Sequence, residues 1–382
     1  MNTRADFALT ADQQMVRDAA EAYLTERCTS EAVRKALETA NGYDESIWKA
    51  IAAELGWAAT HVPEANGGIG LGWIELTLIL EQMGRRLLCS PFFSTAVMGA
   101  TTLIECGSPQ AKDSYLPRIA SGELTVTVGL GGSGIEWDPA RVTAIASGNA
   151  SGYSIKGSFR HVPDGASASL LLLVARLGGE LALFAVPRDR QGLRATEHDS
   201  IDRTRRVAQV DLDDVPVPAD ALIAVGADLE QSLSRVHALC AIALAAEQLG
   251  VAQQCLDLTL TYASERVQFG RTINAFQAVK HRCAEMMVKI EATRSAVFGA
   301  SRAAAESIAT DDLLMEAACV KTFASDTAYF CAQEAIQLHG GVGFTWEYDP
   351  HLYFKRAQAS SHWFGSPDRW RQRVADTLLG VN

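Results

Sequence analysis

The spacing of apolar positions divides the chain into a helical stretch, a stretch of short strands and a second helical stretch. Up to about residue 120 the apolar positions recur at helical spacing, and Thr10 with Gln13 forms the capping-box pattern of a helix start. Two further helical segments, Ser46–Gly56 and Trp73–Met83, are each followed or closed by a glycine, with Gly84 expected to stop the second. This pattern predicts a helical N-terminal domain over residues 1–121.

Between residues 122 and 228 the period changes from helical to alternating. Short apolar runs, several rich in β-branched residues, are separated by clusters of Gly, Pro and Asp. Gly178 and Gly179 lie between two such runs, where a tight hairpin turn is expected. The runs are Thr125–Val128, Arg141–Ala146, Tyr153–Phe159, Leu170–Ala175, Leu181–Val186 and Val207–Leu212. Short strands at this spacing predict a small β-barrel or sandwich as the middle domain.

From residue 229 to residue 382 the helical period returns in longer segments. These segments are Ser232–Ser264, Phe276–Glu306, Asp311–Leu338 and a shorter tail after Pro367. Their length and spacing predict a C-terminal four-helix bundle. The expected fold class is therefore an α+β multidomain protein, with a helical domain, a β middle domain and a helical bundle in that order.

Composition and charge exclude several classes of protein. The 34 Lys and Arg residues against 45 Asp and Glu give a formal net charge of −11, whereas nucleic acids and anionic membranes need a basic surface. The eight cysteines are scattered without a C-x-x-C pair, which favours reduced thiols over a metal site. The first ten residues lack the apolar core of a signal peptide, and no apolar run reaches the ~20 residues of a membrane span. We therefore expect a cytoplasmic protein that binds neither metal nor nucleic acid.

Two segments combine a helix break with residues suited to a phosphate. One runs from Tyr262 to Gln277 and contains R-x-x-F-G-x-x-I-x-x-F-Q, and the other begins at Gln337 and contains Q-x-H-G-G-x-G. Backbone N–H groups at a glycine-rich helix terminus and a nearby guanidinium can both reach a phosphate-bearing ligand. On spacing alone, a helix C-cap and an inter-helix turn would be the favoured interpretation of these segments.

Taken together, the two motifs resemble those of the acyl-CoA dehydrogenase family. The resemblance extends over the whole chain, because the order of helical, β and helical domains and the total length also agree. It implies an FAD-bound dimer or dimer of dimers that dehydrogenates an acyl-CoA between Cα and Cβ. An electron-transfer flavoprotein would then reoxidise the flavin.

The resemblance also implies roles for single residues. In relatives, both motifs reach across the dimer interface to the flavin of the partner subunit. By motif match, Arg266 would pair with the pyrophosphate, Phe269 would pack on the cofactor, and Phe276 and Gln277 would lie near its adenosine end. The residues expected to present amide and backbone donors to the phosphates are Gln337, Gly340 and Gly341.

The match fails at the catalytic base. Most self-sufficient relatives place a Glu in a short turn after an Arg-Asp pair; counting from Arg356 puts Gly365 at that position, and glycine has no proton acceptor. A minority place the Glu on the first long helix of the bundle, where this chain has Cys240. The obvious substitute is Glu247 on the same helical stripe, where Ala-rich surroundings would raise its pKa toward that of a general base. The alternative is a Glu247 that pairs with an Arg or His of another helix, or that reaches solvent.

The middle domain departs from the family as well. Many members have a Thr-Glu-Pro-x-Ala-Gly-Ser-Asp-like loop that contacts flavin and substrate, and the segment Thr125–Pro139 does not follow it. The aromatic-x-Thr pair that lines the flavin ring corresponds to His161-Val-Pro163. The half of the flavin site that each chain supplies to its own cofactor is thus altered in sequence, while the half lent to a neighbour is kept.

This pattern resembles one chain of the heteromeric acyl-CoA dehydrogenases that act on bulky CoA thioesters such as degraded steroid side chains. In those enzymes two unlike subunits share a flavin site and only one carries the base. The resemblance therefore implies an FAD-dependent oxidoreductase of lipid metabolism that acts on an acyl-CoA as a homo-oligomer or as a heterotetramer with an unlike subunit. Two alternatives stay open: a non-catalytic subunit that completes a partner's flavin site, and an enzyme resembling acyl-CoA oxidase.

Overall fold

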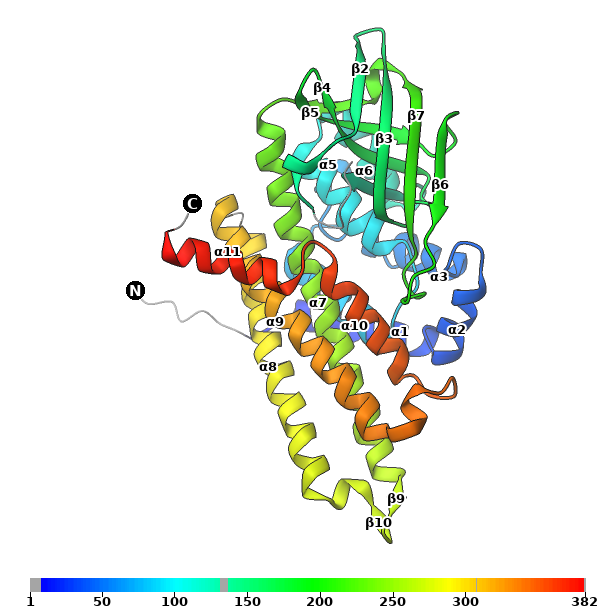
Figure 1. Cartoon of the computed structure of the whole chain (residues 1–382), viewed down its shortest axis with the longest axis vertical. Helices are drawn as coiled ribbons and strands as arrows, with labels where there is room; N and C mark the ends of the chain where they lie inside the picture. The colour runs from blue at the N-terminus through cyan, green and yellow to red at the C-terminus, as the bar shows by residue number, and fades with distance from the viewer. Residues whose placement is uncertain (1–7, 131–136, 307, 381–382) are drawn as a thin grey trace. The chain divides into compact units, whose positions relative to one another are not determined.

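Two compact units make up the chain, and each is assembled from separate stretches of sequence (Figure 1). The computed structural model describes residues 8–130, 137–306 and 308–380. The first unit comprises Met1–Arg34, Trp73–Leu88 and Ala241–Asn382, and the second comprises Lys35–Gly72 and Cys89–Cys240. The boundaries at residues 121 and 228 stay a prediction, because the compact units are not continuous in sequence.

The first part of the chain is helical, as its periodicity predicts. The helices are α1 (Ala11–Arg27), α2 (Ser30–Glu38), α3 (Glu45–Lys49), α4 (Trp73–Arg85), α5 (Ala100–Cys106) and α6 (Pro109–Ala120). A π-helical turn, Ala50–Glu54, continues α3, and another, Phe93–Gly99, leads into α5. The predicted capping box is confirmed: Gln13 N donates to Thr10 Oγ1 at 3.2 Å, and Thr10 N donates to Gln13 Oε1 at 3.1 Å.

Gly84 does not end α4, contrary to the sequence-based expectation; the helix continues to Arg85. Its role is a close approach to the long helix α7 (Asp228–Glu265), since a Cβ at Gly84 would lie 2.0 Å from the backbone oxygen of Glu247. Gly250 of α7 makes the reciprocal close approach, because a Cβ there would lie 1.9 Å from the backbone oxygen of Glu81. Two glycines thus let the backbones of α4 and α7 touch, which fixes the position of Glu247.

The middle of the chain forms one sheet. Its strands are β1 (Val126–Leu130), β2 (Ile145–Asn149), β3 (Gly152–Pro163), β4 (Leu170–Leu177), β5 (Glu180–Pro187), β6 (Leu193–Glu197), β7 (Val207–Val217) and β8 (Leu222–Val225). Their order is β6-β7-β3-β2-β4-β5-β8, and β1 pairs in parallel with β4. Among the described strands the end strands β6 and β8 do not pair, so the expected barrel is not closed. Neither β6 nor β8 is predicted by the sequence pattern.

The hairpin between β4 and β5 is confirmed. Leu177 pairs with Glu180, and the two residues between them, Gly178 and Gly179, have φ values of 61° and 95°. Left-handed backbone at both turn positions matches the right-handed twist of the strands, and glycine adopts it without steric cost. The core under the sheet is built on apolar side chains that include Phe159 and Phe184. Helices α5 and α6 lie beside this sheet in Figure 1.

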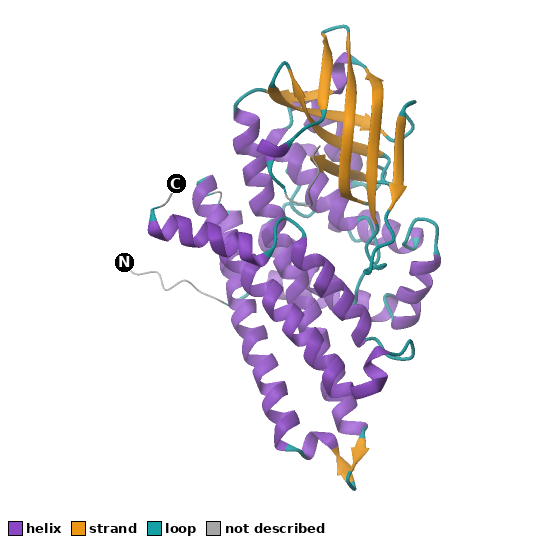
Figure 2. Ribbon diagram, in the orientation of Figure 1, coloured by secondary structure: helices purple, strands orange, loops and turns teal. Residues whose placement is uncertain are grey.

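The C-terminal part confirms the predicted helical bundle (Figure 2). After α7 come α8 (Gln277–Ala305), α9 (Thr310–His339), α10 (Pro350–His362) and α11 (Pro367–Leu379). The hydrophobic pattern does not predict α10, which begins with a proline at its first turn. By length and composition α7 would suffice to cross a membrane, but 89% of its apolar window is buried inside the protein, as in a core helix.

Candidate functional site

The first motif forms a short hairpin at one end of the bundle. Just after α7, β9 (Val267–Gln268) pairs with β10 (Arg271–Thr272), and Phe269 and Gly270 make the turn between them. Their φ values of 53° and 77° are both left-handed, so the turn has the backbone twist typical of two-residue hairpins. Phe269 is 92% exposed at the tip, where Figure 1 shows the hairpin beyond the ends of α7 and α8.

Aromatic contacts connect this hairpin to the start of α8. The rings of Phe269 and Phe276 meet edge to face with centroids 6.1 Å apart, and the Arg271 guanidinium lies 4.2 Å from the Phe276 centroid. Phe276 is the N-cap of α8, and the exposed Gln277 is its first residue. Arg266 is also exposed, and within the described part of the chain no carboxylate pairs with its guanidinium.

The second motif forms the end of α9. Gly340 has φ 65° and ψ −146°, a backbone conformation that is essentially restricted to glycine. Gly341 needs no such conformation, and a Cβ there would meet no described atom within 4 Å. Gln337 and both glycines are exposed. Nothing described in this chain therefore crowds the backbone of Gly341, which a molecule outside the chain can approach.

The structure brings the two motifs together. The rings of Tyr262, from the first motif, and His339, from the second, stack with centroids 4.3 Å apart and planes 21° from parallel. Tyr348 packs edge-on against both rings, at 5.9 Å and 6.1 Å. Burial lowers the pKa of His339, which favours a neutral ring in this stack. Neither Tyr262 nor Tyr348 is a predicted site residue, because the spacing of these tyrosines in the sequence carries no signal of this contact.

The donors at this end suit a flavin dinucleotide. A pyrophosphate needs a cation and N–H donors that can be reached from outside, and Arg266, Gln337 and the Gly341 backbone meet that requirement. An isoalloxazine or adenine ring needs an apolar surface, and Phe269 offers one that the chain itself leaves uncovered. The residues present therefore fit the group that the motifs imply.

Glu247 forms a buried ion pair. Arg356 Nη1 of α10 lies 2.7 Å from Glu247 Oε1, and the two side chains are 1% and 3% exposed. The alternative of a Glu247 that pairs with an arginine of another helix is thus the arrangement observed. The stripe of small residues around Glu247 gave no sign of Arg356, because that arginine lies 109 positions away in sequence.

The two usual base positions hold no carboxylate. Gly365 lies in the turn between α10 and α11 with φ 103°, a conformation that a Glu would adopt only with strain. A Cβ there would also lie 3.3 Å from Trp370 Nε1. Cys240 is fully buried, and burial raises the pKa of its thiol, so the sulfur stays protonated. Glu247 lies about 10 Å further along α7 than Cys240.

In the second unit, the segment that departs from the family motif is only partly described. Residues 131–136, at the centre of Thr125–Pro139, lie outside the described residues. The Thr127 hydroxyl donates to the Pro163 carbonyl at 2.5 Å, so its proton is already used in a hydrogen bond within the chain. His161 is exposed with φ 54°, and its ring lies 5.4 Å from that of His198. Burial lowers the pKa of His161, helped by His198 and Arg160.

Two family models match this chain, one in its N-terminal part and one in its C-terminal part. The family model described as acyl-CoA dehydrogenase, N-terminal domain, matches residues 10–123, and that of the C-terminal domain matches residues 238–379. Acyl-CoA dehydrogenase IpdE2 of Mycobacterium tuberculosis is 32% identical over 95% of this chain and 96% of that protein.

Solved structures give the same result for the fold. A chain of the ChsE4-ChsE5 complex from Mycobacterium tuberculosis superposes with a TM-score of 0.88 at 25% identity, over 99% of this chain and 100% of that one. A variant of the Tcur3481-Tcur3483 steroid ACAD superposes with a TM-score of 0.86 at 30% identity, over 97% of this chain and 98% of that one.

Proposed function

The chain belongs to the acyl-CoA dehydrogenase family of flavoprotein oxidoreductases, and from this premise we propose that it takes part in FAD-dependent dehydrogenation of an acyl-CoA thioester between Cα and Cβ. We further propose that it works as one chain of a heteromeric enzyme for bulky, steroid-type thioesters. The names of two solved neighbours, the ChsE4-ChsE5 complex and the Tcur3481-Tcur3483 steroid ACAD, support an assembly of unlike chains.

One observation carries the heteromeric proposal. The chain keeps the outward-facing donors of the flavin motifs, yet neither usual base position holds a carboxylate. Arg266 and Gln337 are exposed at one end of the first unit, while Gly365 and Cys240 occupy the base positions. A chain with this combination of features can complete a flavin site in a neighbour and depends on that neighbour for proton removal.

In this proposal the residues of this chain hold the cofactor in position. When bound, FAD would supply the acceptor for the hydride equivalent from Cβ of the thioester. The Arg266 guanidinium would neutralise pyrophosphate charge, and the Gln337 amide and Gly341 N–H would donate to phosphate oxygens. Phe269 would cover an apolar face of the cofactor and, being 92% exposed in this chain, would itself be covered in the assembly.

The α-proton has to go to a carboxylate, and Glu247 is poorly placed to take it. Arg356 at 2.7 Å stabilises the negative charge that a general base gives up when it accepts a proton. Breaking this contact would take a carboxylate away from a buried guanidinium. We therefore assign the base to the partner chain, with Glu247 as the base only if the chain dehydrogenates a thioester by itself.

The test is the absorbance spectrum of the chain purified alone, followed by anaerobic titration with short, long and steroid-type acyl-CoA thioesters. We expect a chain that is colourless, or yellow but not bleached, and that becomes competent only with an unlike subunit. If an acyl-CoA bleaches the isolated chain, and Glu247→Gln abolishes the bleaching while the exposed Glu316→Gln does not, the assignment to a partner is wrong.

Two further readouts separate the remaining alternatives. A chain that restores flavin to a partner but leaves the turnover of that partner's own site unchanged would be a non-catalytic subunit, which the missing carboxylate also favours. Oxygen consumption without an electron-transfer flavoprotein would identify an oxidase. We propose the flavoprotein as acceptor, so turnover should depend on its addition.

A further inference from the structure

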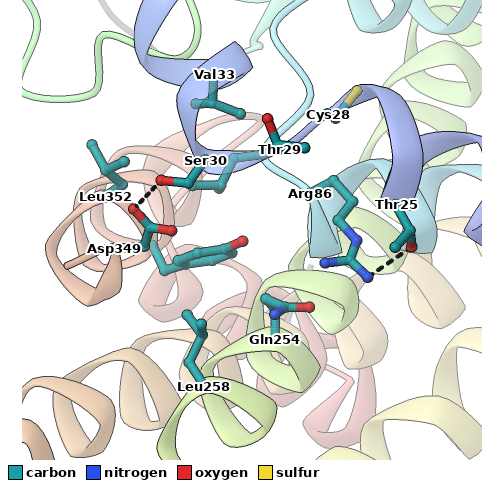
Figure 3. Close-up of a pocket in the computed structure, with 12 residues that line it drawn as sticks. Thr25, Cys28, Thr29, Ser30, Val33, Arg86, Gln254, Leu258, Asp349 and Leu352 are labelled. Atoms are coloured by element: carbon teal, nitrogen blue, oxygen red, sulfur yellow. Dashed lines mark hydrogen bonds between the residues drawn. The ribbon is translucent and has the colours of Figure 1, made fainter. Parts of the chain in front are cut away.

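A pocket separate from both flavin motifs lies within the first unit (Figure 3). Side chains of α1, α2, α7 and α10 line it, together with the connection after α4 and other residues next to these helices, and its volume is about 270 Å³. None of the motif residues assigned to the flavin is among them. The volume is below the range of roughly 300–1,000 Å³ typical of sites for drug-sized ligands, so an occupant would be a small molecule.

One wall of the pocket holds a polar atom without a partner. Gln254 of α7 is 8% exposed, and its Oε1 accepts no hydrogen bond from any described residue. A buried amide oxygen without a donor is costly, and such atoms are rare in folded proteins. A hydroxyl in the pocket would satisfy this position, because it can donate to the amide oxygen and can equally accept from the amide nitrogen.

The same wall carries a cation that is free to bind an anion. Arg86, half-buried after the end of α4, donates from Nη2 to Thr25 Oγ1 at 2.8 Å, and no carboxylate of the described residues pairs with it. The nearby carboxylates are held by other arginines: Glu21 and Asp257 by Arg85, and Asp349 by Arg34. The remaining guanidinium donors of Arg86 are therefore available to a ligand.

The opposite wall limits what that ligand can be. Figure 3 shows Arg86 and Gln254 on one side of the pocket and Ser30 with Asp349 on the other, where the Ser30 hydroxyl donates to Asp349 Oδ1 at 2.7 Å. Val33, Leu258 and Leu352 add apolar surface. A single free guanidinium suits a carboxylate, whereas a phosphate dianion would need a second cation, and the neighbouring arginines are already paired.

We propose that this pocket binds a small hydroxycarboxylate, with its carboxylate on Arg86, its hydroxyl on Gln254 and its short carbon chain against Val33 and Leu258. The inference does not depend on the proposed function, because no residue of the pocket acts in the flavin site or in the assignment of the base. Failure of one proposal leaves the other standing.

Isothermal titration calorimetry of the purified full chain tests the proposal with four probes. 3-Hydroxybutyrate carries both groups, butyrate lacks the hydroxyl, 1,3-butanediol lacks the carboxylate, and inorganic phosphate tests for a general anion site. We expect 3-hydroxybutyrate to bind roughly tenfold or more tightly than the other three. Butyrate leaves the Gln254 amide oxygen without a donor, and 1,3-butanediol leaves the Arg86 guanidinium without an anion. Phosphate lacks the carbon chain, and the pocket offers its dianion no second free cation.

Variants locate the binding. Arg86→Gln and Gln254→Leu should each weaken 3-hydroxybutyrate binding by roughly tenfold or more, whereas the exposed Arg373→Gln of α11 should not. Without ligand, Gln254→Leu should unfold at the same or a higher temperature than the parent, because it removes an unpaired buried oxygen. The ligand should raise the unfolding temperature of the parent and of Arg373→Gln only.

The proposal is overturned if 3-hydroxybutyrate does not bind, if it binds no better than butyrate or phosphate, or if both pocket variants bind it as the parent does. A folded Gln254→Leu chain that is much less stable than the parent would also count against it. That result would mean that the amide has a structural partner.

Discussion

The buried pair of Glu247 and Arg356 gives the sharpest prediction about stability. The pair joins α7 to α10 through a 2.7 Å contact, with both side chains almost fully buried. Replacing Arg356 by Met keeps an unbranched side chain but removes the guanidinium. The variant then holds the Glu247 carboxylate in the core without the Arg356 guanidinium.

The magnitude follows from the burial of both groups. Removing one partner of a buried ion pair costs about 3–5 kcal/mol, because the other charge stays desolvated and uncompensated. Replacing both partners by apolar side chains of similar size is much less costly and is often close to neutral. Arg356→Met and Glu247→Leu should each lower the free energy of unfolding by about 3–5 kcal/mol, and the double variant should recover most of that loss.

The assay is urea unfolding followed by far-ultraviolet circular dichroism, for the parent, both single variants and the double variant. Arg302→Met is the matched control, because its ion pair with Glu306 is surface-exposed at 3.5 Å and should contribute about 0.5 kcal/mol or less.

Two results would refute this reasoning. If Arg356→Met costs no more than Arg302→Met, the two buried groups do not depend on each other. If the deficits of the two single variants simply add in the double variant, there is no coupling between them, and Glu247 is free to act elsewhere.

Three further predictions follow from single residues. Gly365→Ala should lower the free energy of unfolding by about 1–2 kcal/mol in urea, because φ 103° is strained for any side chain, whereas Gly299→Ala inside α8, which meets no described atom, should raise it. Burial lowers the pKa of Lys321 from 10.5 to about 7, so the unfolded chain binds more protons between these values. The free energy of unfolding should therefore rise between pH 7 and pH 10.5, by up to about 1.4 kcal/mol per pH unit. Urea unfolding at a series of pH values measures this slope, which should be absent in Lys321→Met. Phe269→Asn should leave stability unchanged or slightly higher, because asparagine tolerates φ 53° better, yet the assembled enzyme should lose FAD faster on gel filtration; equal retention would contradict its role at the cofactor.

Much of the fold and the placement of the motifs could be predicted because the signals are local. The change of period from helical to alternating and back gives the order of helical, β and helical parts, since side-chain direction repeats within a few residues in each element. The Thr10 capping box and the Gly178–Gly179 hairpin depend only on neighbours in sequence, and both are confirmed. The two flavin motifs are likewise short and intact, which is why the family could be identified before the structure.

Tertiary structure decided whatever depends on partners that are far apart in sequence. The sequence pattern predicts Gly84 as a helix stop, but this glycine allows a close contact with Glu247 of α7, more than 150 residues away in sequence. The sequence pattern places the Glu247 carboxylate on an apolar helical stripe, but in the folded chain it forms an ion pair with Arg356. No sequence motif predicts the pocket of Arg86 and Gln254, because it forms only where four helices and the connection after α4 come together. Periodicity determines which face of an element is buried; only packing determines which residue of another element it is buried against, and that partner sets the chemistry of a buried charge.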